Sequence, residues 1–67
     1  MAVIVSERVL MAAARANRAQ AIVSGLRGLL ELAMSVDDDI SDALLVALGV
    51  AARVCRERED ELAKVSA

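Results

Sequence analysis

The sequence predicts an all-α protein folded as an antiparallel two-helix hairpin, and three observations support this prediction. The 67 residues contain no proline and no aromatic residue, and Ala, Leu and Val dominate the 58% that are hydrophobic, which is typical of helices rather than sheets. The helical pattern is interrupted once, at residues 35–39. On both sides of that interruption, apolar residues recur at alternating steps of four and three, the spacing that keeps one stripe of a helix against a partner helix.

A chain of this length forms one small domain at most. We therefore expect a single hairpin over residues 1–67, divided into a short arm at 1–5, a helix at about 6–34, a turn at about 35–39 and a helix at about 40–64.

Local signals place the two helix starts. Ser6 is a plausible N-cap of the first helix, because its hydroxyl can accept a hydrogen bond from a first-turn N–H. Asp37, Asp38 and Asp39 suit the start of the second helix, because carboxylates accept these N–H groups and oppose the positive end of the helix dipole. The apolar arm before Ser6 is expected to fold back on the first helix or to pair as a strand with another chain.

The apolar stripes of the two helices, which together we call the seam, face each other residue by residue when the chain is folded about residues 35–39. In each facing pair, such as Leu26 with Leu48, the two residue numbers add up to the same value. Arg58 is the one charged member and faces Ala16, so we expect its aliphatic stem to cross the seam while its guanidinium reaches water or a carboxylate. The seam residues are Val5, Val9, Ala12, Ala16, Ala19, Val23, Leu26, Leu30 and Ala33 of the first helix and Leu44, Leu48, Ala51, Cys55, Arg58, Leu62 and Val65 of the second.

A second apolar stripe remains uncovered in the half nearest the turn. Domains this small are marginal without disulfides, metals or oligomerisation, and an uncovered apolar patch marks an interface. We therefore predict a homodimer in which two hairpins form a four-helix bundle. Gly25 and Gly28 are likewise expected to allow close contact with another helix. The predicted dimer or partner interface contains Ile22, Leu29, Leu32, Val36, Ile40, Ala43, Ala47, Val50 and Val54.

No catalytic, metal or cofactor site is predicted, and we expect a protein that is not an enzyme. The chain has no histidine and a single cysteine, Cys55, whose seam position predicts a buried and unreactive thiol. Asp37–Asp39 and Asp42 lack the alternating ligands, glycine and distal glutamate of a calcium loop, so helix capping is the favoured interpretation.

The open end of the hairpin is rich in charge, and Arg8, Arg15, Arg18, Arg53, Arg56 and Arg58 form a possible recognition surface there. The favoured alternative is a solvated helix end with pairs such as Arg53–Glu57 and Arg56–Asp60 at i,i+4. The net charge of −2 and the absence of aromatic residues argue against a nucleic-acid partner. No secretory signal or membrane span is expected, which favours a cytoplasmic location.

In length and hairpin plan the chain resembles the plasmid copy-number RNA-binding repressor of primer, a family that binds RNA through polar and basic residues along one face of a dimer. It is also similar to small phage-encoded inhibitors, such as quorum-sensing anti-activators and anti-CRISPR proteins, several of which are compact all-helical adaptors. Both resemblances cover the whole chain as a shape, so no functional residue is carried over from either group.

Three functions are consistent with this pattern. The leading hypothesis is a regulator or inhibitor, a dimeric hairpin that masks a surface of another bacterial protein. The first alternative is an RNA-binding hairpin that uses Arg8, Arg15 and Arg18. The second is a structural or chaperone-like subunit whose apolar stripe is covered permanently by a different protein.

Overall fold

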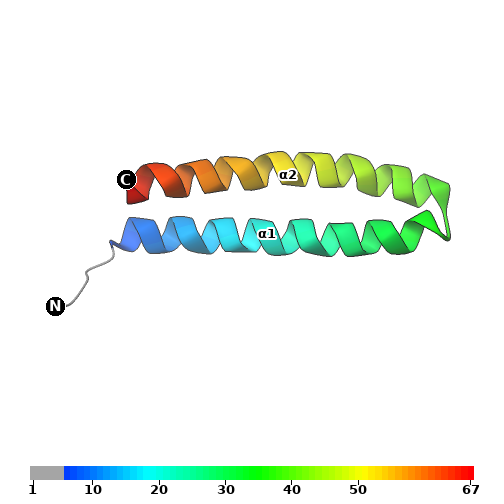
Figure 1. Cartoon of the computed structure of the whole chain (residues 1–67), viewed down its shortest axis with the longest axis horizontal. Coiled ribbons are helices and arrows are strands. Elements are labelled where there is room, and N and C mark those ends of the chain that lie inside the picture. Colours follow the sequence, from blue (N-terminus) through cyan, green and yellow to red (C-terminus); the bar gives the residue numbers. More distant parts are fainter. Residues whose placement is uncertain (1–5) are drawn as a thin grey trace.

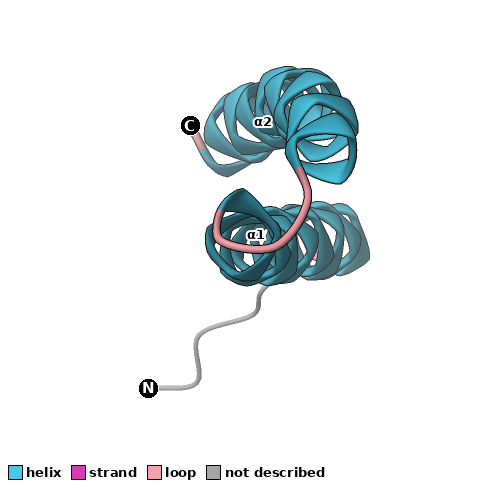
Figure 2. Ribbon diagram, turned by 90° about the vertical axis from the view of Figure 1, so that its right-hand side faces the viewer, coloured by secondary structure: helices cyan, strands magenta, loops and turns pink. Residues whose placement is uncertain are grey.

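The computed structural model describes residues 6–67, and it confirms the predicted antiparallel helical hairpin. Helix α1 spans Glu7–Met34 and helix α2 spans Asp38–Ser66. The two helices lie side by side along their whole length, with the turn at one end and the start of α1 and the end of α2 at the other (Figure 1). Viewed along the hairpin, the connecting loop crosses directly from one helix to the other (Figure 2). The predicted arm, residues 1–5, lies outside the described residues.

The start of α1 follows the sequence signal. Ser6 is the N-cap, and its Oγ accepts a hydrogen bond from the backbone N–H of Val9 at 3.2 Å. Glu7 lies in the first turn, where its charge opposes the positive end of the helix dipole.

The turn is tighter than predicted, because α1 ends at Met34 and α2 begins at Asp38. The carbonyl of Ala33 accepts hydrogen bonds from the N–H groups of Val36 and Asp37, at 3.0 and 2.8 Å. The Asp37 side chain then accepts from the N–H groups of Asp39 and Ile40, at 2.9 and 3.1 Å. The first aspartate of the three is therefore the N-cap, and α2 begins about two residues earlier than the sequence suggested. It also ends two residues later, at Ser66.

The interface between the helices follows the predicted seam. Every buried residue of α1 belongs to it, namely Ala12, Ala16, Val23 and Ala33. On α2 the buried residues are Cys55, which was predicted, and Ser41, which extends the seam by one step of three beyond Leu44. The remaining predicted seam residues of the described helices are half-buried.

Two polar contacts join the helices, and the first agrees with the predicted register. Arg15 Nη1 lies 3.0 Å from Glu61 Oε1, and Gln20 Nε2 donates to Glu59 Oε1 at 3.0 Å. Arg15 lies between Ala12 and Ala16 on α1, and Glu61 lies between the residues predicted to face them on α2. The Arg15–Glu61 ion pair therefore agrees with the register of the seam.

The hydrophobic core is thin. Among the described residues no side chain is less than 2% exposed, and three of the five buried apolar residues are alanines. Alanine contributes little apolar area, so the seam alone removes little surface from water.

Candidate protein-binding surface

The side chains of the second apolar stripe lie on the surface of the hairpin. Ile22, Leu29 and Leu32 lie on α1 and Val36 lies in the turn after it, and these four are 54% to 78% exposed. On α2, Ile40 and Val50 are 53% and 48% exposed, Ala43 and Ala47 are also exposed, and Val54 is half-buried. We call these nine residues the apolar face.

The apolar face lies on one side of the hairpin and draws on both helices. Leu29 and Leu32 of α1 and Val36 of the turn line the same open groove as Ile40 of α2, with a volume of about 480 Å³. The other residues of the apolar face follow on the same helical stripes, because steps of three and four return a side chain to the same side of a helix. The structure thus brings together four predicted residues directly and aligns the rest with them.

The apolar character of this groove is nearly complete. Asp37 is the only charged residue that lines it, and its carboxylate already accepts two backbone hydrogen bonds as the N-cap of α2. The groove therefore offers a ligand almost no polar contact, and it suits another apolar surface.

The opposite side of the hairpin is polar. A second groove there is lined by Gln20, Ser24, Arg27, Arg56 and Glu59 around the seam residues Val23, Ala52 and Cys55. The hairpin is therefore amphipathic as a whole, with one apolar and one polar side flanking the seam.

Cys55 lies at the floor of the polar groove and is 7% exposed. Burial raises the pKa of its thiol above the ordinary value, and the charge of Glu59 acts in the same direction. The thiol also lies 3.7 Å from Glu59 Oε1, to which it donates a weak hydrogen bond. A neutral, buried thiol is a poor nucleophile, so this geometry gives Cys55 a packing role.

The charged open end is held by ion pairs other than the expected ones. Within residues 6–67, the ion pairs are Arg15–Glu61 at 3.0 Å and Arg58–Glu61 at 3.6 Å. The predicted pairs Arg53–Glu57 and Arg56–Asp60 do not form, and Glu61 accepts one arginine from each helix. Arg58 is half-buried and its guanidinium reaches a carboxylate, as its seam position predicted.

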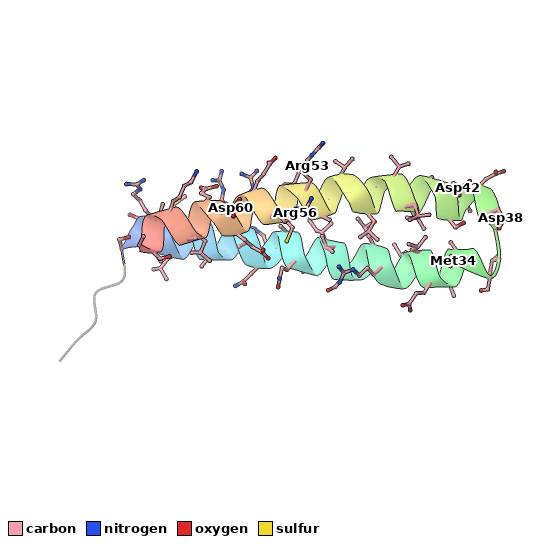
Figure 3. All side chains as sticks on the ribbon, turned by 45° about the horizontal axis from the view of Figure 1, so that its top comes forward. Met34, Asp38, Asp42, Arg53, Arg56 and Asp60 are labelled. Carbon is pink, nitrogen blue, oxygen red and sulfur yellow. The ribbon has the colours of Figure 1, made fainter. Side chains whose placement is uncertain are left out.

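Four of the six candidate recognition arginines point into solvent. Arg8, Arg18, Arg53 and Arg56 are exposed and form no ion pair with another described residue. Figure 3 labels Arg53 and Arg56 on α2, between the turn-end Asp38 and Asp42 and the open-end Asp60. Acidic and basic side chains are thus mixed on the open half of α2.

Gly25 and Gly28 do not mark a close approach of α1 to α2. A Cβ added at either glycine would meet no atom within 4 Å, and the same is true at Gly49. The expectation of close contact with another helix is therefore not met inside the hairpin.

Several exposed apolar residues were not predicted. Leu45 and Val46 are 55% and 70% exposed on α2, and Leu10, Met11 and Met34 are also exposed on α1. A helical wheel places Leu45 on the polar side of α2, about 160° from Ala47, so it does not belong to the apolar face.

In the described part of the chain, no three His, Cys, Asp or Glu side chains are grouped so that they could hold a metal ion. Neither of the two described helices combines the length and the apolar character that crossing a bilayer requires. Comparison of the chain with known protein families, curated proteins and solved structures finds no match.

Proposed function

We propose that this chain is a non-enzymatic protein-binding module, a hairpin that self-associates through its apolar face and acts as a regulator or inhibitor of another bacterial protein in the cytoplasm. The observation that carries the proposal is the apolar face itself, which is contributed by both helices and exposed along the turn half of the molecule.

Burial of the apolar face against another protein surface is favourable in free energy. Full burial of one Leu, Ile or Val side chain stabilises a protein by about 1.5–3 kcal/mol. The hairpin alone leaves Ile22, Leu29, Leu32, Val36 and Ile40 more than half exposed, while its own seam buries mainly alanine. A second copy removes the larger side chains from water and supplies the core that the single chain lacks.

The same surface provides a regulatory mechanism. Apolar helix faces bind other apolar helix faces through side chains spaced three and four residues apart. A target protein that exposes a helix pair with such a stripe takes the place of the second copy, and the hairpin then covers that surface of the target.

The RNA-binding alternative has less support from the charges. Arg15 is paired with Glu61 across the hairpin, and Glu57, Glu59 and Asp60 lie on the same end of α2. Arg8 and Arg18 form no ion pair with a described residue, but these nearby carboxylates lower the positive potential that phosphate binding needs, so the open end is a weak phosphate site.

Two leucines of equal exposure test the proposal. Leu29 lies on the apolar face and is 54% exposed, whereas Leu45 lies on the polar side and is 55% exposed. We expect Leu29→Ser to weaken self-association, measured by light scattering across a dilution series, by at least about tenfold, since it removes a buried aliphatic group from the interface. Leu45→Ser should leave self-association unchanged. Equal effects of the two variants would rule out the apolar face as the interface.

A further inference from the structure

We infer that the second copy packs on the apolar face in reversed orientation, with the two turns at opposite ends of the bundle. A two-fold axis then passes level with Leu29 and Ala47, so Leu29 lies against Leu29 of the second copy and Ala47 against its own equivalent. This inference rests on the proposed self-association and adds to it the orientation and register of the two chains.

The first argument is the symmetry of the two stripes. Ile22 and Val36 lie seven residues before and after Leu29, and Ile40 and Val54 lie seven residues before and after Ala47. The α2 stripe therefore extends for one heptad on both sides of its centre, a total of about 21 Å at 1.5 Å per residue. On the α1 side, Ile22 lies one heptad before Leu29, and Val36 follows the end of the helix in the turn. The outer residues of each stripe thus lie at similar distances from its centre, which matches a copy that runs in the opposite direction.

The second argument is that the two midpoints are level across the hairpin. The residue numbers of Leu29 and Ala47 add up to 76, as do those of the ion pair Arg15–Glu61 that joins α1 to α2, and the seam pairs add up to 74. The two midpoints therefore lie within two residues, or about 3 Å, of the same level. In an antiparallel pair of helices, residues whose numbers have the same sum lie at about the same height. A single two-fold axis therefore passes level with the midpoints of both stripes.

The third argument is the distribution of charge along the hairpin. The turn half, residues 22–52, carries five acidic residues and only one basic residue, Arg27. The rest of the chain carries seven basic and five acidic residues. Turns at the same end would bring two acidic turn ends together, and like charges near one another oppose association.

Reversed orientation places opposite charges together instead. Arg18 continues the α1 stripe four residues beyond Ile22, and it is exposed without an ion pair among the described residues. In this arrangement it lies just beyond Val36 of the second copy, where the turn aspartates are.

Single-cysteine crosslinking tests the orientation. In a full-length Cys55→Ala background, Leu29→Cys, Ala47→Cys and the control Leu45→Cys are each oxidised under mild conditions and also treated with a short bis-maleimide. Light scattering of the reduced proteins confirms their association state beforehand. We expect Leu29→Cys alone and Ala47→Cys alone to form covalent dimers at least about tenfold faster than Leu45→Cys, because the paired thiols are held at high effective concentration.

Other outcomes separate the orientation from the proposed function. Crosslinking only in a mixture of Leu29→Cys with Ala47→Cys would mean that α1 packs against α2 of the second copy, with the turns at the same end. A light-scattering dimer that does not crosslink through either cysteine would also overturn the reversed orientation. Both results would leave self-association standing. Proteins that remain monomeric by light scattering would overturn the orientation and the proposed function together.

Discussion

At the scale of single residues, side chains in the seam stabilise the hairpin, whereas exposed side chains contribute little to its stability. Leu26 is half-buried between the helices, opposite Leu48 in the predicted register, whereas Arg56 is exposed and forms no ion pair with a described residue. Removal of the two side chains therefore has different consequences.

We predict that Leu26→Asp lowers the free energy of unfolding by more than about 2 kcal/mol, because it places an unpaired charge against apolar residues. Arg56→Ala should change it by less than about 0.5 kcal/mol, as is usual for an exposed site. Urea melts at one fixed protein concentration compare the two variants. The reverse ranking would show that the seam register is wrong.

The buried thiol of Cys55 provides a second prediction at this scale. Burial and Glu59 raise its pKa in the folded chain above the ordinary value of 9.0. The thiol is therefore neutral in both the folded and the unfolded chain at neutral pH. Above about pH 9 the unfolded chain loses this proton first, so the contribution of Cys55 to stability is lost as the pH rises toward the folded pKa.

Alkylation rates measure this directly. At pH 8 iodoacetamide should react with Cys55 more slowly in buffer than in strong denaturant, because the thiolate is the nucleophile and is disfavoured in the folded chain. Equal rates in the two solutions would mean that the thiol is not buried in the seam.

At the scale of the helices, the turn is defined by one capping residue rather than by a cluster. Asp37 accepts the N–H groups of Asp39 and Ile40, while Asp38 and Asp39 lie in the first turn of α2, where their charge opposes the helix dipole. Asp42 lies one turn further along and has no capping role.

We therefore predict that Asp37→Ala destabilises the hairpin by about 1 kcal/mol, the usual cost of losing an N-cap side chain. Asp42→Ala is the matched control, since it removes one negative charge from the same helix without removing a cap. Thermal melts followed by circular dichroism compare the two. A larger loss for Asp42→Ala would contradict the capping geometry.

The helices and their seam were predictable from the sequence because both depend on local, periodic signals. Steps of three and four identified all four buried residues of α1. The start of α2 was less predictable, since any of three consecutive aspartates satisfies the capping rule and the backbone of the turn decides among them. The ion pairs at the open end were also missed, because several arginines and carboxylates there lie at i,i+3 or i,i+4 spacing and because Arg15–Glu61 joins the two helices, which spacing within one helix does not reveal.

The apolar face shows a different limit of prediction from the sequence. The sequence placed its nine residues, and the structure leaves eight of them exposed, with Val54 half-buried. Which molecule covers these residues depends on a second surface that neither the sequence nor the single chain contains.

At the scale of the whole molecule, charge and apolar surface divide between the two halves of the hairpin. If association depends on the apolar half, salt should have little effect on it, because buried apolar contacts are not screened. We expect no gel shift with mixed cellular RNA or duplex DNA at physiological salt. A salt-sensitive shift at micromolar protein, lost when Arg8, Arg15 and Arg18 are all replaced by alanine, would favour the nucleic-acid alternative.

Self-association of the unmodified chain is the central claim, and its native mass and thermal midpoint over a range of concentrations test it most directly. We predict a mass of twice the 7.1 kDa of the chain and a midpoint that rises with concentration, because association stabilises the folded state by mass action. A folded monomer of 7.1 kDa, with a midpoint that does not depend on concentration, would contradict the account.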